Sequence, residues 1–363
     1  MRVVTFGEVM IRLAPPGWLR LGQVLPGSLD ATFGGAEVNV AVSIAAQGGR
    51  AAFCTSLPDN PLTDAFVQEL RRFNVDTDFI QRTRDGRFGI YFVETGANQR
   101  SGTVTYDRAG SAIAITPPEA YNWSKILEGA TRFHVTGITP AISASASHAA
   151  LAAVKAAAER KIPVSCDLNF RKKLWNWEPG AKPAVLARRV MEQLLTSVSL
   201  LIANEEDAEQ VLGIRAQNTN VEKGELDPAG YVDVARQIAE RFPAIQYVAI
   251  TLRESLSASH NNWGGMLYER GSDRAWFAPA NSAGEYQPYA ITHIVDRVGA
   301  GDAFAGGLLF ALDRPELSAP ETALRYAVAA SCLKHSIIGD FNSSTRTEVE
   351  ALMRGGGAGR VQR

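Results

Sequence analysis

The sequence predicts a three-layer α/β/α protein, in which helices cover both faces of a mostly parallel central sheet and a small β-sheet forms a lid. Short β-rich runs alternate with helical stretches along most of the chain, as in repeated β–α units. Apolar residues make up 46% of the 363 residues, which is enough for a large core. One region does not follow this alternation of strands and helices. Two β-rich runs, 88–93 and 103–106, are separated only by a polar turn, as in a hairpin.

The central sheet is predicted from short apolar runs that end at polar or helical segments. These runs lie at residues 3–6, 51–55, 132–136, 163–168, 199–203 and 247–252. Helices are expected at 37–47, 62–73 and 147–160. In the first of these helices Val38, Ala41, Val42 and Ala45 share one face, so the helix has an apolar side to pack on the sheet.

The lid is predicted from two insertions, at about residues 12–33 and 88–113. Together with these insertions, residues 1–342 are expected to form one catalytic unit, and residues 343–363 a C-terminal helix and tail. The polar stretch 217–230 is predicted to be a surface insertion, and residues 355–363 to be flexible.

Charge and cysteine content narrow the range of functions. Lys and Arg total 37 and Asp and Glu total 38, so the net charge is −1 and favours neither a nucleic acid nor a membrane partner. Cys54, Cys166 and Cys332 are far apart and form no metal-binding or disulfide pattern. No apolar run approaches the roughly 20 residues that span a bilayer, and Glu8 and Arg12 interrupt the N-terminal segment. We therefore expect a soluble, cytoplasmic protein with a small-molecule ligand.

The most informative stretch is residues 296–307, DRVGAGDAFAGG, which leads into an apolar helical run. Gly299 and Gly301 let backbone N–H groups turn toward one point at the start of a helix, where anions bind. Asp302, in the first turn, is placed to accept a proton from a hydroxyl while those amides stabilise a phosphoryl group. The alternative is that Asp302 only caps the helix. The chain has no Walker P-loop, and Phe304 stands where a dinucleotide fingerprint needs glycine.

Two motifs together resemble the signature of the PfkB, or ribokinase-like, carbohydrate kinases: Gly299-Ala300-Gly301-Asp302 and the early Gly34-Gly35-Ala36-Glu37-Val38-Asn39. Further segments resemble the branch that acts on 2-keto-3-deoxygluconate. They are Tyr106-Asp107-Arg108, Gly110-Ser111-Ala112, Asp167-Leu168-Asn169-Phe170-Arg171, Ile202-Ala203-Asn204-Glu205-Glu206-Asp207 and Gly339-Asp340-Phe341. The resemblance spans residues 3–341. It implies a ribokinase-like fold and an enzyme that uses ATP and Mg²⁺ to make 2-keto-3-deoxy-6-phosphogluconate.

The resemblance also implies roles for individual residues. Asp302 would be the catalytic base, beside the amides of Gly299, Ala300 and Gly301. The residues expected to contact the sugar acid are Gly34, Gly35, Asn39, Tyr106, Arg108, Arg171, Asp302 and Asp340. Those expected to bind ATP are Asn169, Asn204, Thr251, Arg253, Gly299 and Gly301. Arg108 and Arg171 suit the carboxylate of a keto acid because guanidinium binds carboxylate through two parallel hydrogen bonds; a surface ion pair is the alternative for each.

Three positions depart from the pattern of the family. Asp207 stands where the N-x-x-E motif has a glutamate, so we expect at most an indirect, water-mediated contact with Mg²⁺, or simply a helix cap with Asn204. Arg253 replaces the glycine of a Thr-x-Gly turn at an expected strand end, followed by a loop at 254–265; it either faces phosphate or is structural. Arg12 lies near the position of an aspartate in kinases of neutral sugars, so it either suits an anionic substrate or is exposed on the lid.

Several alternatives remain open from sequence. A kinase of fructose, ribose or a nucleoside would share these motifs, and a catalytically silent sugar-binding protein is a more distant possibility. The preference between gluconate- and galactonate-type keto acids is not determined. We expect a homo-oligomer, a dimer or larger; apolar lid positions such as Ile90 and Phe92 would suit a dimer interface, and would equally suit the sugar pocket.

Overall fold

The computed structural model describes residues 2–215 and 228–355. In this part of the chain one large sheet consists of β1 (Val3–Phe6), β4 (Ala51–Pro58), β5 (Ile80–Thr83), β8 (Arg132–Thr136), β9 (Val164–Asp167), β10 (Leu200–Asn204), β11 (Tyr247–Ser257), β12 (His260–Glu269), β13 (Arg274–Ala278) and β14 (Tyr289–Ile291). The order is β13-β12-β11-β10-β9-β8-β1-β4-β5, with β14 paired to β12. All strands from β5 to β11 in this order are parallel, whereas β12, β13 and β14 are antiparallel. The predicted mostly parallel sheet is confirmed.

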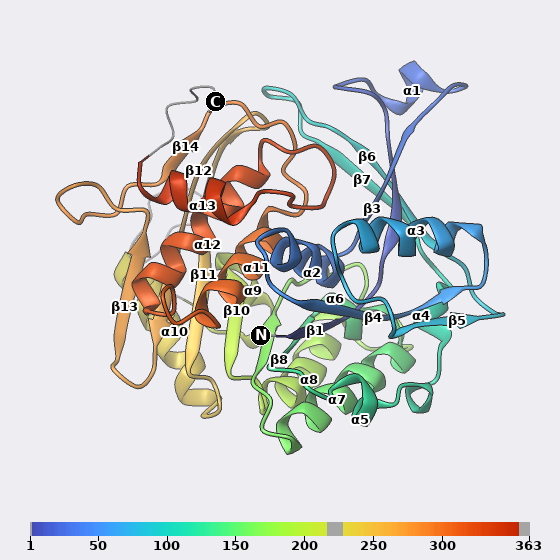
Figure 1. Ribbon diagram of the computed structural model, residues 1–363, viewed down its shortest axis with the longest axis horizontal. Helices are drawn as coiled ribbons and strands as arrows, with labels where there is room; N and C mark the ends of the chain where they lie inside the picture. Colours follow the sequence, from blue (N-terminus) through green and yellow to red (C-terminus); the bar gives the residue numbers. More distant parts are fainter. Residues whose placement is uncertain (1, 216–227, 356–363) are drawn as a thin grey trace.

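Helices cover both faces of this sheet (Figure 1). One face carries α2 (Ala36–Ala46), α3 (Pro61–Arg72), α11 (Ala300–Leu312), α12 (Pro320–Lys334) and α13 (Arg346–Met353). The other carries α4 (Ala112–Ile115), α5 (Trp123–Ile126), α6 (Ile138–Ile142), α7 (Ala144–Glu159), α8 (Pro183–Leu195) and α10 (Pro228–Arg241). Short helical turns lie at η1 (Pro118–Ala120), α9 (Glu205–Asp207) and η2 (Ala208–Leu212).

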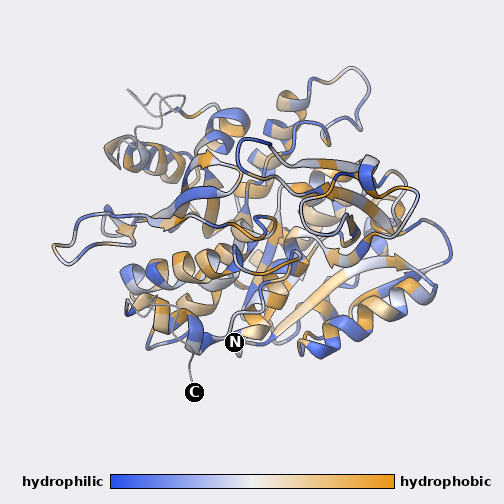
Figure 2. Ribbon diagram, turned by 90° about the horizontal axis from the view of Figure 1, so that it is seen from above, coloured by the Kyte–Doolittle hydropathy of each residue, from blue (hydrophilic) through white to orange (hydrophobic). Residues whose placement is uncertain are grey.

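The core consists of two layers because successive strand residues point to opposite faces of the sheet. Val3 and Phe53 pack with α2 and α11, whereas their neighbours Val4 and Cys54 pack with α7 and α8. Each fully buried Val, Leu or Phe side chain contributes roughly 1.5–3 kcal/mol. Figure 2 shows hydrophobic residues gathered on the central strands and hydrophilic residues along the outward sides of the helices.

A separate four-stranded sheet consists of β2 (Met10–Ala14), β3 (Asp30–Gly34), β6 (Gly89–Glu94) and β7 (Thr103–Asp107), in the order β3-β2-β6-β7. We call it the small sheet. The antiparallel pairing of β6 with β7 confirms the predicted hairpin. The small sheet extends away from the large one, and the turn of α1 (Leu21–Val24) lies at its far end (Figure 1).

One expectation about local structure is wrong. The predicted loop at 254–265 is an antiparallel hairpin, because β11 runs on to Ser257 and β12 begins at His260. Thr251 and Arg253 therefore lie within a strand, paired with Gly265 and Trp263, and not at its end. Polar residues suit this hairpin because part of it stays accessible: Ser255 is exposed, and Ser257 and Asn262 are half-buried.

Two predicted segments lie mostly outside the described residues. Residues 228–230 of the predicted insertion begin α10, and the remainder, like the tail beyond residue 355, is outside them. The division into residues 1–342 and 343–363 stays a prediction; α13 packs on α12 and contributes the buried Val349 to the core. Among the described residues, no helix has the length and apolar character needed to cross a membrane.

Candidate active site

Helix α11 begins at a turn that only glycine can form. Gly299 is the N-cap residue and has a φ of 83°, in the left-handed region. A Cβ on Gly299 would lie 2.1 Å from the carbonyl oxygen of Asp340. The turn therefore brings the loop that contains Asp340 against the start of the helix, and Asp302 follows in the first helical turn.

The early and late glycine motifs meet in space, as the resemblance implied. The Nδ2 group of Asn39 donates a hydrogen bond of 2.7 Å to Oδ2 of Asp302, across 263 residues of chain. The Oδ1 atom of Asn39 accepts a hydrogen bond from the N–H of Gly35, which fixes the orientation of the amide. Helix α2 thus holds one oxygen of Asp302 and leaves Oδ1 available.

The surroundings of Asp302 shift its ionisation. Burial, together with the charges of Asp340 and Glu37, raises the pKa of Asp302 to about 7, although the hydrogen bond from Asn39 and the charge of Arg171 oppose the shift. A carboxylate whose pKa lies near neutrality can take up a proton during a reaction and release it afterwards. This property is suited to a general base.

Asp302 opens into a cavity of about 380 Å³ between the carboxyl ends of the parallel strands and the small sheet. Most of the residues predicted to form the site line this cavity. They are Gly35, Asn39, Tyr106, Arg108, Asn169, Arg171, Gly299, Asp302 and Asp340. Its position agrees with the rule that open α/β sheets bind ligands at the carboxyl ends of their strands.

The other predicted site residues lie around this cavity without lining it. Gly34 faces Asp340 and Tyr91, and a Cβ there would lie 2.2 Å from Oδ2 of Asp340. Ala300 is buried in the first turn of α11, and Gly301 is exposed beside it. Thr251 and Arg253 lie on β11. Asn204 ends β10.

Asn204 and Asp207 form a helix cap. Oδ1 of Asn204 accepts hydrogen bonds from the N–H groups of Glu206 and Asp207, both 2.9 Å. The two carboxylate oxygens of Asp207 accept the N–H of Phe170 at 3.1 Å and of Asn204 at 3.5 Å. Burial raises the pKa of Asp207 to about 6. The capping interpretation is confirmed, and a water-mediated contact with Mg²⁺ stays a prediction.

The two predicted carboxylate-binding arginines have different surroundings. Arg108 is buried and forms an ion pair with Glu8, which lies just after β1. Arg171 is exposed, and its only hydrogen bond within the described residues goes to the carbonyl of Phe170 at 3.3 Å. Arg171 therefore offers the cavity a positive charge that no described carboxylate neutralises through an ion pair.

The expectations for Arg12 need correction, because it is neither exposed nor part of the cavity lining. Its guanidinium is 3% exposed and contacts Asp296 at 2.6 Å and Asp340 at 2.9 Å. The hydroxyl of Tyr91 donates to the other oxygen of Asp340 at 2.6 Å. Arg12 thus joins strand β2 of the small sheet to the two loops that flank the start of α11.

Sequence reasoning missed three polar residues that line the cavity: Glu8, Tyr91 and Arg297. Glu8 follows β1 directly, so a survey of the carboxyl ends of all strands would have found it. Tyr91 follows from the period-two alternation of β6, in which residues 89, 91 and 93 are buried. Arg297 lies two residues before Gly299, within the motif itself.

Comparison with known proteins identifies a family of similar chains. The model of the pfkB family of carbohydrate kinases matches residues 1–252 and 253–345. The chain is 35% identical over 357 residues, 98% of both chains, to a 2-dehydro-3-deoxygalactonokinase of Haloferax volcanii. The solved structure of a 2-dehydro-3-deoxygluconokinase of Thermotoga maritima is 43% identical, with a TM-score of 0.87 over 98% of this chain and 99% of that one.

A third similar protein is a putative 2-keto-3-deoxygluconate kinase of Enterococcus faecalis. Its structure is 25% identical, with a TM-score of 0.86 over 100% of this chain and 99% of that one. The similarity to these proteins extends over nearly the full length, through both sheets and both glycine motifs. The chain belongs to the pfkB family of carbohydrate kinases.

Proposed function

We propose that this protein transfers the γ-phosphoryl group of ATP to the terminal hydroxyl of 2-keto-3-deoxygluconate. The observation that carries the proposal is one cavity in which Asp302, held by Asn39, lies with the cation Arg171. Proteins named for this activity on gluconate- or galactonate-type keto acids are among the similar ones described above. Asp302 would accept the proton of the substrate hydroxyl, and Arg171 would bind the carboxylate of the substrate.

The charges of the cavity support an anionic sugar. Arg108 is already paired with Glu8, so Arg171 carries the net attraction for the carboxylate of the substrate. Arg108 then serves mainly as a hydrogen-bond donor, with its guanidinium 5.4 Å from the ring centre of Tyr106. A charge-assisted hydrogen bond between Arg171 and a carboxylate is roughly twice as strong as a neutral one.

The transfer itself follows from the position of Asp302. Oδ1 of Asp302 accepts the proton of the substrate hydroxyl, while Asn39 holds Oδ2. The hydroxyl oxygen forms a bond to the γ-phosphorus as the bond to the bridging oxygen of ADP breaks, so ADP leaves with that electron pair. The amides at the start of α11, from Gly299 to Asp302, stabilise the charge on the transferred group.

Mg²⁺ fits this site as a companion of the nucleotide. In the described part of the chain no cluster of three or more acidic, His or Cys side chains is arranged to hold a metal ion, and Asp207 has both oxygens engaged with backbone N–H groups. Mg²⁺ commonly keeps most of its ligands as water and phosphate oxygen, with few from protein. When bound, the ion neutralises phosphate charge; Asp207 would orient its water shell.

The decisive experiment measures ATP-dependent phosphorylation of 2-keto-3-deoxygluconate, with fructose, ribose and adenosine for comparison. We expect strong preference for the keto acid, and a loss of roughly 10²–10⁴-fold in kcat for Asp302→Asn, because a general base contributes about that factor. Arg171→Met should raise KM for the keto acid roughly 10- to 100-fold, the worth of a charged hydrogen bond. Activity on a neutral sugar alone would refute the role of Arg171, and no turnover of any acceptor would favour a silent sugar-binding protein.

A second substrate is favoured by one observation, the relative from Haloferax volcanii that is named for the galactonate-type keto acid. The two keto acids differ in the orientation of one hydroxyl at C4. Comparing kcat/KM for both epimers decides between them, and equal values would mean that the cavity does not distinguish this hydroxyl.

We also propose a homo-oligomer that acts in the cytoplasm, where ATP is supplied. Ile90 and Phe92 alternate with the buried Tyr91 and are absent from the cavity lining, which favours their role at an interface over a role in the sugar pocket. Trp18, at the far end of the small sheet, is 53% exposed. Light scattering on the purified protein tests the proposal, and a monomer at all concentrations would contradict it.

A further inference from the structure

We infer that Arg297 and Arg253 form a cationic pair that holds the phosphate chain of the nucleotide as it reaches Asp302. This inference rests on the proposed function, because it adds Arg297 to the residues that bind the nucleotide in the same reaction and gives Arg253, already expected to bind ATP, a specific role at the phosphates. From sequence, Arg253 is open between a phosphate contact and a structural role, and Arg297 has no expected role.

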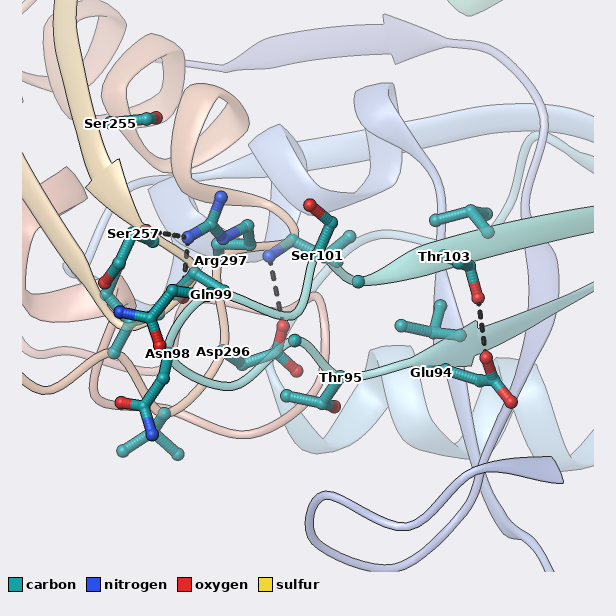
Figure 3. A pocket seen from close by; sticks show the side chains of 18 of the residues that line it. Glu94, Thr95, Asn98, Gln99, Ser101, Thr103, Ser255, Ser257, Asp296 and Arg297 are labelled. Atoms are coloured by element: carbon teal, nitrogen blue, oxygen red, sulfur yellow. Dashed lines mark hydrogen bonds between the residues drawn. The ribbon is translucent and has the colours of Figure 1, made fainter. Parts of the chain in front are cut away.

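Arg297 stands where two cavities adjoin. It lines the cavity of Asp302 and also a second cavity of about 520 Å³, which lies between the β6–β7 turn, the β11–β12 hairpin and residues 294–298. Figure 3 shows its side chain reaching toward Ser257. It donates hydrogen bonds to the carbonyls of Ser257 at 3.2 Å and Ala258 at 2.6 Å, so its head group is held at the turn between β11 and β12.

A chain of contacts links the strand that carries Arg253 to the segment that leads into Arg297. Arg253 pairs across the hairpin with Trp263, whose ring lies 5.1 Å from that of His335. The carbonyl of His335 in turn accepts hydrogen bonds from the N–H groups of Val295 at 2.9 Å and Asp296 at 3.2 Å. The segment that leads into Arg297 is thus tied to the neighbour of Arg253.

Within the described chain, these two cations lack neutralising partners. Among the ion pairs of the described residues, none involves Arg253 or Arg297, and the nearby carboxylate of Asp296 is already bound to Arg12. Burial and the charge of Arg253 lower the pKa of Arg297. Burial, with smaller effects from the charges of Lys334, Arg297 and Arg253, lowers the pKa of His335 to about 4. Like charges held close together are unfavourable, and an anion between them relieves the repulsion.

The phosphate chain fits this place better than the sugar acid does. In the first cavity, Arg171 is the cation expected to bind the carboxylate of the sugar acid. Arg253 lies on strand β11 and lines neither cavity. A chain of phosphates carries several charges over its length, so it can reach Asp302 at one end and Arg253 farther along. The amides at the start of α11, and the part of the Arg297 guanidinium that does not bind Ser257 and Ala258, then bind the same transferred group.

The experiment compares Arg297→Met, Arg253→Met and the double variant with wild type. Each single change should raise KM for ATP roughly 10- to 100-fold, the factor expected for a charged hydrogen bond, and leave KM for the keto acid within about twofold. Arg270→Met is the matched control, since Arg270 also donates to a backbone carbonyl, that of Pro243, but at the opposite end of the sheet. Arg297→Met removes two hydrogen bonds and could disturb the fold. Arg253→Met removes no side-chain hydrogen bond or ion pair within the described residues, so it tests the pair even if Arg297→Met is misfolded.

A binding measurement separates this inference from the proposed function. Calorimetry with ADP and with inorganic tripolyphosphate needs no turnover, and both should bind about tenfold more weakly to each variant, with a smaller dependence on salt. If wild type phosphorylates no keto acid but these affinities still fall, the substrate proposal fails and the arginine pair stands. Unchanged affinities and unchanged KM for ATP in both variants would overturn the pair, as would a rise confined to KM for the keto acid.

Discussion

The surroundings of Asp302 raise its pKa to near neutrality, so the activity of the enzyme should depend on pH in this range. Its pKa of about 7 means that the carboxylate, the form able to accept a proton, is lost as pH falls below 7. We predict that kcat/KM falls roughly tenfold per pH unit on the acid side, as for any base of this kind. The hydrogen bond from Asn39 favours the carboxylate, so Asn39→Ala should raise the pKa and move the profile to higher pH.

The quantity to measure is the shift between the pH profiles of wild type and Asn39→Ala, because the titration of ATP itself affects both proteins equally. Profiles of kcat/KM from about pH 5.5 to 9 with saturating Mg²⁺ are sufficient. Coincident profiles would mean that Asn39 does not set the pKa of Asp302, and a flat wild-type profile would remove Asp302 from the role of base.

The start of helix α11 requires a glycine at Gly299 but should tolerate a larger residue at Gly301. Gly299 has a φ of 83°, and a Cβ added there would lie 2.1 Å from a carbonyl oxygen, whereas a Cβ on Gly301 would meet nothing within 4 Å. We predict that Gly299→Ala lowers the free energy of unfolding by about 2–4 kcal/mol through strain and displacement of the Asp340 loop. Gly301→Ala should leave stability unchanged or raise it by about 1 kcal/mol, because alanine favours a helix.

Urea unfolding of both variants tests this difference, with Gly301→Ala as the control for adding a methyl group in the same turn. Equal losses would show that the left-handed turn is not what the helix start requires. Activity gives independent information, since Gly301→Ala places a methyl group where the transferred phosphoryl group is expected and should reduce kcat without unfolding the protein.

At the scale of the whole molecule, Arg12 connects the two sheets through buried charge. Its two carboxylate partners, Asp296 and Asp340, flank α11 and are almost completely buried. Removing the cation from such a group leaves uncompensated charge, so Arg12→Met should lower the free energy of unfolding by about 3–5 kcal/mol. Arg12→Lys keeps the charge and should cost less.

The matched control is Arg82, which also contacts two aspartates, Asp59 at 3.0 Å and Asp64 at 2.6 Å, but near the surface. Arg82→Met should cost only about 0–1 kcal/mol, as exposed ion pairs do. Urea unfolding of the three variants decides the matter. A similar small loss for Arg12→Met and Arg82→Met would mean that the buried network does not hold the small sheet in place.

The features that could be predicted from the sequence are local: the strands β1, β4 and β8 to β11, the helices α2, α3 and α7, the hairpin of β6 and β7, and the turn before Asp302. Periodicity and glycine placement are local properties, so patterns only a few residues long report them. The extension of β11 to Ser257 was missed because a polar hairpin, stabilised by its partner strand, resembles a loop in sequence.

Which charged side chains pair with one another could not be predicted from the sequence. Arg12 was open between a substrate contact and an exposed position, yet it binds Asp296 and Asp340, and Arg108 pairs with Glu8 at a separation of 100 residues. The link between the strand of Arg253 and the segment of Arg297 likewise runs through Trp263 and His335. The physical reason is that an ionic partner is chosen by distance and burial in the folded chain, and neither can be obtained from the spacing of residues along it.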